Sequence, residues 1–151
     1  MGVSKVKEIV NEKKVIDELY KLIDLVGTKE TLYAIGDIYT LKAKKIPLAK
    51  SVYKKICSVL DLDENFIYEK GNITENKKVG AAFCFYLLRN KFNFEYSEIC
   101  YTLNISYSIQ WCSRLYSLIR DAKLEKPKNP LDILIAKHNK ELVEFSNNLV
   151  N

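Results

Sequence analysis

Apolar residues recur three or four positions apart along nearly the whole chain, and this spacing restricts the fold more than any other feature. It is clear at Ile16, Leu19 and Ile23, and it returns at Val52 and Ile56. Residues spaced in this way share one face of an α-helix, whereas a half-buried strand alternates at every second residue. The sequence contains no such alternation, and only 5 of its 151 residues are Gly and 3 are Pro. We therefore predict an all-α fold, a multi-helix orthogonal bundle.

Glycine, proline and short polar residues divide this pattern into segments. A first helix over 3–26, either continuous or broken near Asn11, is expected to stop at Gly27. Thr28 is placed to cap a second helix that ends near residue 45, and Pro47 is placed to open a third. The buried stripe expected on the second helix consists of Leu32, Ile35, Ile38 and Leu41.

The second half of the chain shows the same alternation of helices and turns. Asn104 suits a left-handed turn, and Ser106 can cap the helix that follows it. Asn129 and Pro130 form a cap and first position for the last helix. Helices are therefore expected over 74–90, 97–103, 106–121 and 131–151. By region, we expect an N-terminal helical part (1–47), a helix-turn-helix domain (48–122), a linker (123–130) and a C-terminal amphipathic helix (131–151).

Several functional classes have little support in the composition. The chain has one His and no grouping of a nucleophile with a base, so we predict a protein that is not an enzyme and needs no cofactor. Its cysteines show no C-x-x-C pair and are expected to be buried and reduced. No apolar run approaches the length of a membrane span, and no signal peptide is evident. We expect a cytoplasmic location, or a phage particle. The four cysteines are Cys57, Cys84, Cys100 and Cys112.

A stretch without carboxylates runs from Ile99 to Arg120, although 28% of all residues are charged. Short polar side chains lie there at the start of a predicted helix, and amides and hydroxyls can bond base edges in the major groove. The net charge of +5 is compatible with DNA phosphates. We predict base contacts from Ser106, Tyr107 and Gln110, and phosphate contacts from Lys77, Lys78, Arg89, Lys91, Arg114 and Arg120. The alternative is a solvated helix surface. Trp111 is expected in the core or at an interface.

The segments "SVLDLDENFIYEKGNI" and "GAAFCFYLLRNKFNFEYSEICYTLNISYSIQWCSRLYSLI" have a recognisable order of apolar helices. In this order the chain resembles the C-terminal DNA-binding domain of the bacterial replication initiator DnaA, a Trp-repressor-like helical fold. The resemblance implies a helix-turn-helix with a recognition helix in the major groove. The DNA-contact signature of the family is degenerate here, because Ser106, Tyr107, Ser108 and Ile109 occupy its place and Ala81 replaces an arginine.

The last helix carries apolar residues spaced four-three-four-three-four, as in a coiled-coil seam. It can fold back on the N-terminal helices, or it can pair with a second copy of the chain. The seam residues are Leu131, Ile135, His138, Leu142, Phe145 and Leu149.

Two functions follow from these observations. The first is a duplex-DNA-binding protein of phage or mobile-element type, a replication accessory or a transcriptional regulator. The alternative is a non-enzymatic helical structural or adaptor subunit, for example of a phage particle, that keeps the fold without reading DNA.

Overall fold

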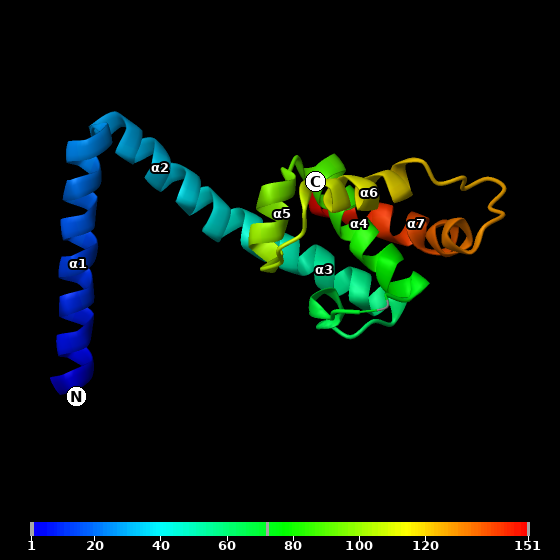
Figure 1. Ribbon diagram of the computed structural model, residues 1–151, viewed down its shortest axis with the longest axis horizontal. Coiled ribbons are helices and arrows are strands. Elements are labelled where there is room, and N and C mark those ends of the chain that lie inside the picture. The colour runs from blue at the N-terminus through cyan, green and yellow to red at the C-terminus, as the bar shows by residue number, and fades with distance from the viewer. Residues whose placement is uncertain (1, 72, 151) are drawn as a thin grey trace. The chain divides into compact units, whose positions relative to one another are not determined.

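In the computed structural model the described residues, 2–71 and 73–150, form only helices and connections, so the predicted all-α class is confirmed. They fall into two compact units, Met1–Ala43 (the N-terminal unit) and Lys44–Asn151 (the C-terminal unit). Figure 1 shows the elements. Their bounds are α1 Gly2–Val26, α2 Thr28–Thr40, the π-helical turn η1 Leu41–Lys45, α3 Ile46–Leu60, the 3-10 turn η2 Phe66–Tyr68, α4 Glu75–Phe92, α5 Tyr96–Leu103, α6 Ile109–Arg120 and α7 Pro130–Val150.

Helix α4 is the centre of the C-terminal unit. It contacts α3, α5, α6 and α7, and its apolar residues surround the helix rather than forming one stripe. A helix that is apolar on all sides is stable only when its neighbours cover it completely. Gly80 allows the preceding loop to approach, because a Cβ atom there would lie 2.7 Å from Cδ1 of Leu62. The buried residues of α4 are Val79, Gly80, Ala81, Ala82, Phe83, Cys84, Phe85, Leu87 and Leu88.

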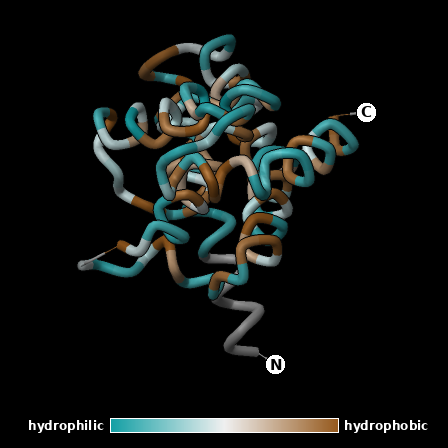
Figure 2. The backbone as a smooth tube through the Cα atoms, turned by 90° about the vertical axis from the view of Figure 1, so that its right-hand side faces the viewer, coloured by the Kyte–Doolittle hydropathy of each residue, from teal (hydrophilic) through white to brown (hydrophobic). Residues whose placement is uncertain are grey.

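Three helices of this unit end on a residue with left-handed backbone. Asp61, Asn93 and Asn104 have φ values of 52°, 58° and 55°. Asp and Asn tolerate this conformation better than other residues with a side chain, so the helices stop where these residues occur. The prediction for Asn104 is confirmed. Figure 2 shows polar and apolar residues interleaved along the helical turns, as amphipathic helices require.

Helix α7 packs into the core of its own unit, against α3 and α4. Ile135 and Leu142 are fully buried there. Glu141 forms an ion pair with Lys55 of α3 at 3.2 Å, and the ammonium group of Lys55 also lies 5.5 Å from the centre of the Phe145 ring. The cap predicted at the start of α7 is confirmed, since the N–H of Asp132 donates to the side chain of Asn129 at 2.8 Å.

The expected seam is therefore used within the chain. Of its six residues, Ile135 and Leu142 are buried, Leu131, His138 and Phe145 are half-buried, and Leu149 is exposed. The helix folds back, as one alternative held, but its partners α3 and α4 belong to the C-terminal unit instead of the N-terminal helices. The apolar faces of α3 and α4 lie in the same unit as α7, and α7 packs against them.

The N-terminal unit consists of α1 and α2, joined at a bend (Figure 1). Helix α1 is continuous, and Gly27 ends it with φ 94°, a conformation that favours glycine. The predicted cap is wrong, because Gly27 occupies the N-cap and Thr28 is the first residue of α2. The predicted buried stripe is also wrong: Leu32, Ile35 and Ile38 are exposed and Leu41 is only half-buried, since two helices alone cannot enclose a core.

None of the described helices is long and apolar enough to cross a bilayer.

Candidate nucleic-acid interface

Helix α6 begins at Ile109, two residues later than a cap at Ser106 would place it. Ser108, rather than Ser106, caps it, because the Ser108 hydroxyl accepts a hydrogen bond from the N–H of Trp111 at 3.2 Å. The helix buries Cys112, Leu115 and Ile119 against the core. The opposite face is exposed at Gln110, Ser113 and Arg114, and Ser106 is exposed in the connection before it.

Two residues of the predicted reading region are placed differently from expectation. Ile109 lies three residues before the buried Cys112, a spacing that predicts a core position, but as the first residue of α6 it is 72% exposed. We predicted Tyr107 on the exposed face. Its ring stacks on Phe85 with centroids 5.9 Å apart, and its hydroxyl donates to the carbonyl of Ile67 at 2.9 Å. Burial raises the Tyr107 pKa to about 12.

These contacts hold the connection between α5 and α6 in place. The hydroxyl of Tyr68 in η2 donates to the Leu103 carbonyl at 2.6 Å, and the hydroxyl of Tyr107 donates to the Ile67 carbonyl in η2. Two tyrosines therefore tie η2 to the last residue of α5 and to the residues just before α6. Tyr107 holds the residues before α6 in place, and its hydroxyl has no further proton to donate, which argues against the base contact predicted for it.

An open groove of about 740 Å³ lies between α6 and the linker. Arg114 lines it together with Lys123, Lys126 and Lys128, which the sequence placed only in a polar connection. Asp121 and Asp132 also line the groove. Within the described part of the chain Arg114 forms no ion pair, so its guanidinium can bind an anion without first losing a partner. Four cations therefore border the exposed face of α6.

The cations at the beginning of α4 are partly engaged. Lys77 forms an ion pair with Glu69, and the Lys78 ammonium lies 5.9 Å from the centre of the Trp111 ring. Trp111, expected in the core or at an interface, is half-buried and packs against the core. The contact puts the Lys78 charge beside the first turn of α6, whereas Lys77 must give up a carboxylate before it can contact a phosphate.

At the other end of α4, Arg89 is exposed and Lys91 is half-buried. The Arg89 guanidinium stacks 4.3 Å from the centre of the Tyr96 ring. Arg120, at the end of α6, donates from Nε and Nη2 to Asp121 at 2.8 and 3.0 Å. These hydrogen bonds lower the pKa of the Asp121 carboxyl. Along α4, Arg89 and Lys91 lie 11 to 14 residues after Lys77 and Lys78, so the predicted phosphate set does not form a single cluster.

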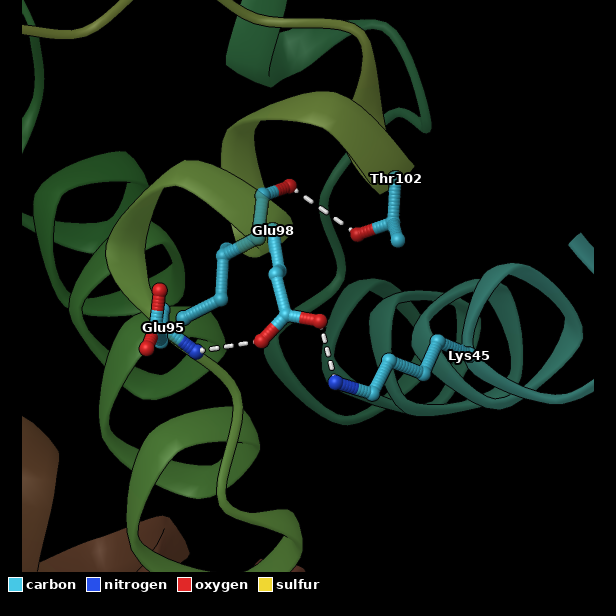
Figure 3. A network of polar contacts seen from close by, with 5 residues as sticks. Lys45, Glu95, Glu98 and Thr102 are labelled. Carbon is cyan, nitrogen blue, oxygen red and sulfur yellow. Dashed lines mark hydrogen bonds and ion pairs between the residues drawn. The ribbon is translucent and has the colours of Figure 1, made fainter. Parts of the chain in front are cut away.

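An ion pair fixes the first turn of α5 (Figure 3). Glu98 binds Lys45 with one carboxylate oxygen and accepts the N–H of Glu95 with the other, at 3.1 Å. Burial raises the pKa of Glu98, but the hydrogen bonds from Lys45 and Glu95 and the charge of Lys45 outweigh this, leaving the pKa below its ordinary value. The Thr102 hydroxyl donates to the Ile99 carbonyl at 3.0 Å on the next turn. Because Lys45 and Glu98 are 53 residues apart, the sequence alone did not indicate this ion pair.

The cysteines are free thiols, and three of the four are buried. Burial raises the pKa of Cys57 and Cys84, and it raises the pKa of Cys112 to about 12. Cys100 is half-buried, and its Sγ lies 3.8 Å from Sγ of Cys112. The expectation of buried thiols therefore holds for Cys57, Cys84 and Cys112 and is too strong for Cys100.

Comparison with models of protein families, with curated proteins and with solved structures found no match to this chain.

Proposed function

We propose that the C-terminal unit binds duplex DNA, with α5 and α6 as a helix-turn-helix and the first turns of α6 in the major groove. One observation carries the proposal: the exposed face of α6 has no carboxylate before Asp121 and borders a groove that contains three lysines. Polyanion binding requires such a face, since phosphate contacts supply most of the affinity and every nearby carboxylate would oppose it.

The exposed side chains of α6 support distinct roles. Gln110 can bond an adenine through both its amide atoms, and Ser106 and Ser113 can bond base edges. Ile109 supplies an apolar contact for a thymine methyl, a role that the sequence pattern did not suggest. Arg114 and the lysines of the linker would follow the phosphate backbone. Lys78 and Arg89 would add phosphate contacts at the two ends of α4.

Replication and transcription both use proteins that bind duplex DNA without catalysing a reaction. The resemblance to the DNA-binding domain of the DnaA initiator favours an accessory of replication or a regulator of transcription. Its altered contact residues, Ser106 to Ile109, favour a DNA site different from that of the initiator family.

A second candidate is a helical subunit of an assembly that keeps this fold without reading DNA. The exposed apolar side chains of the N-terminal unit favour it, because monomeric proteins rarely expose large contiguous apolar patches. DNA affinity distinguishes the two candidates.

The test is binding of the full chain to fluorescent duplexes of random sequence over a series of salt concentrations. We expect affinity to fall linearly on logarithmic axes, with a slope of about −0.9 for each phosphate neutralised. Arg114→Ala should weaken binding to all duplexes alike and reduce the slope by about 1. Lys54→Ala serves as the control, since Lys54 is an exposed cation of α3 that does not line the groove.

Sequence reading is tested separately on a duplex selected for tight binding. Gln110→Ala should reduce the preference at one base pair by about 1–3 kcal/mol, with little change on random duplexes. An absence of duplex binding at low salt would exclude the proposal and leave the assembly subunit as the better description. Equal losses of duplex affinity for Arg114→Ala and Lys54→Ala would show that the exposed face of α6 is not the DNA-binding surface.

A further inference from the structure

The N-terminal unit exposes an unusual amount of apolar surface for its size. From residue 15 to residue 39, eleven large apolar side chains are at least about a third exposed. Scattered apolar residues on a surface need no explanation, whereas a continuous set does. The eleven are Val15, Ile16, Tyr20, Leu22, Leu25, Val26, Leu32, Tyr33, Ile35, Ile38 and Tyr39.

Nine of these side chains lie on two apolar stripes, one on α1 and one on α2. On α1 the positions Ile16, Leu19, Ile23 and Val26 are spaced three-four-three, and Val15, Tyr20 and Leu22 border them. On α2 the central positions are Ile35 and Ile38, in line with the buried Thr31 and bordered by Leu32 and Tyr39. Only Leu25 and Tyr33 lie on the opposite faces, because 100° per residue carries them away from the stripe.

The width of these stripes favours a bundle over a two-stranded coil. In a two-stranded coiled coil only two positions of each seven are apolar and the flanking positions carry charges. Here the flanking positions hold Val15, Tyr20 and Leu22 on α1 and Leu32 and Tyr39 on α2. Helices with apolar flanks are typical of bundles in which each helix touches two neighbours. One chain provides two such helices, and two chains provide four.

The area is sufficient for a stable interface. With aromatic side chains contributing 150–250 Å² when fully exposed, the nine stripe residues expose roughly 900 Å² per chain. A standard protein interface buries about 800 Å² from each partner. The stripes of two copies would therefore provide enough area for a standard interface without contributions from other parts of the chain.

The distribution of charge selects a second copy as the partner. Residues 1–43 contain seven lysines and seven carboxylates, so this part has no net charge, while residues 44–151 carry the whole excess of +5. A surface for nucleic acid or anionic lipid needs an excess of cations, which is absent here. Two neutral units of mixed sign do not repel each other, and apolar contact can hold them together.

We propose that the N-terminal unit pairs with the same unit of a second copy of this chain, with α1 and α2 of each copy forming a four-helix bundle. The proposal does not depend on DNA binding by the C-terminal unit, because self-association is measured without DNA. If both proposals hold, pairing places two reading helices in one particle.

The test measures the mass of the full chain in solution by light scattering after gel filtration, from low to high micromolar concentration. We expect about twice the chain mass of 17.5 kDa. Tyr39→Glu should convert the particle to a single chain, with the dissociation constant raised at least about tenfold, because the stripe would bury a carboxylate without a partner. Ile16→Glu should act in the same way from α1.

Tyr33→Glu is the matched control. Tyr33 and Tyr39 are on the same helix and are 61% and 66% exposed, but only Tyr39 lies on the stripe. Both variants should keep the parent's far-ultraviolet circular dichroism, because neither side chain supports the fold of the single chain. A parent mass of 17.5 kDa at every concentration would overturn the proposal, and so would equal effects of the two tyrosine variants.

Discussion

At the scale of single residues, the arrangement of the candidate interface depends on contacts between residues far apart in the sequence. Tyr107 reaches Ile67 with its hydroxyl, and Glu98 reaches Lys45. Neither side chain touches a ligand in the proposed function. Both set where α5 and α6 begin, so that Gln110 and Arg114 point outward from a fixed helix.

The Lys45–Glu98 ion pair gives a prediction about stability. Both side chains are 26% exposed, so solvent screens the pair only in part. Glu98→Gln keeps an acceptor for the N–H of Glu95 and removes the charge, and should lower the free energy of unfolding at pH 7 by about 1 kcal/mol.

The dependence on pH follows from the direction of the pKa shift. The pKa of Glu98 is lower in the folded chain than its ordinary value of 4.5, so its contribution is complete above that value and declines as the pH falls through the folded pKa. Urea unfolding should show a difference between parent and Glu98→Gln at pH 7 that shrinks toward pH 3. A difference independent of pH would contradict the assigned ion pair.

At the scale of elements, α7 is the clearest case of a pattern with two outcomes. Its apolar stripe suits a coiled coil between chains as well as a place in a core, and spacing alone does not distinguish them. The presence of α3 and α4 decides for the core, since both present apolar surface that α7 covers.

Two leucines seven residues apart on α7 test this packing. Leu142 is fully buried and Leu149 is 40% exposed. Leu142→Ala should lower the free energy of unfolding by about 2–4 kcal/mol, because it leaves a cavity against α3 and α4. Leu149→Ala should cost less than about 1 kcal/mol. Chemical denaturation measures both, and equal losses would place the α7 interface elsewhere.

At the scale of the whole molecule, the two units differ in how their helices are stabilised. The C-terminal unit encloses a core around α4, whereas α1 and α2 leave most of their apolar stripes exposed in a single chain. Helical segments without buried apolar contacts open readily, and their amide protons exchange with solvent at low cost in free energy.

Hydrogen exchange should show this difference directly. Amides of α1 and α2 are expected to exchange faster than those of α4 in dilute solution, since fewer buried contacts oppose opening. Raising the protein concentration should slow exchange in α1 and α2 and leave α4 unchanged, because pairing protects only the N-terminal unit. Protection in α1 and α2 that is independent of concentration would contradict self-association.

The sequence by itself determined the helical class, the stops at Gly27 and Asn104, and the cap at Asn129, because these depend on local spacing and on the backbone preferences of single residues. It also identified most of the exposed polar face of α6. Ile109 was assigned to the core because it lies three residues before Cys112, but it is the first residue of α6 and is exposed there.

Only the tertiary structure decided which apolar stripes are covered. The stripes of α2 and α7 look alike in sequence, yet that of α7 lies in a core and that of α2 is exposed. The spacing of apolar residues determines which face of a helix avoids water, while the identity of the element that covers it depends on contacts between distant parts of the chain. For the same reason the linker lysines joined Arg114 in one groove only when the chain was folded.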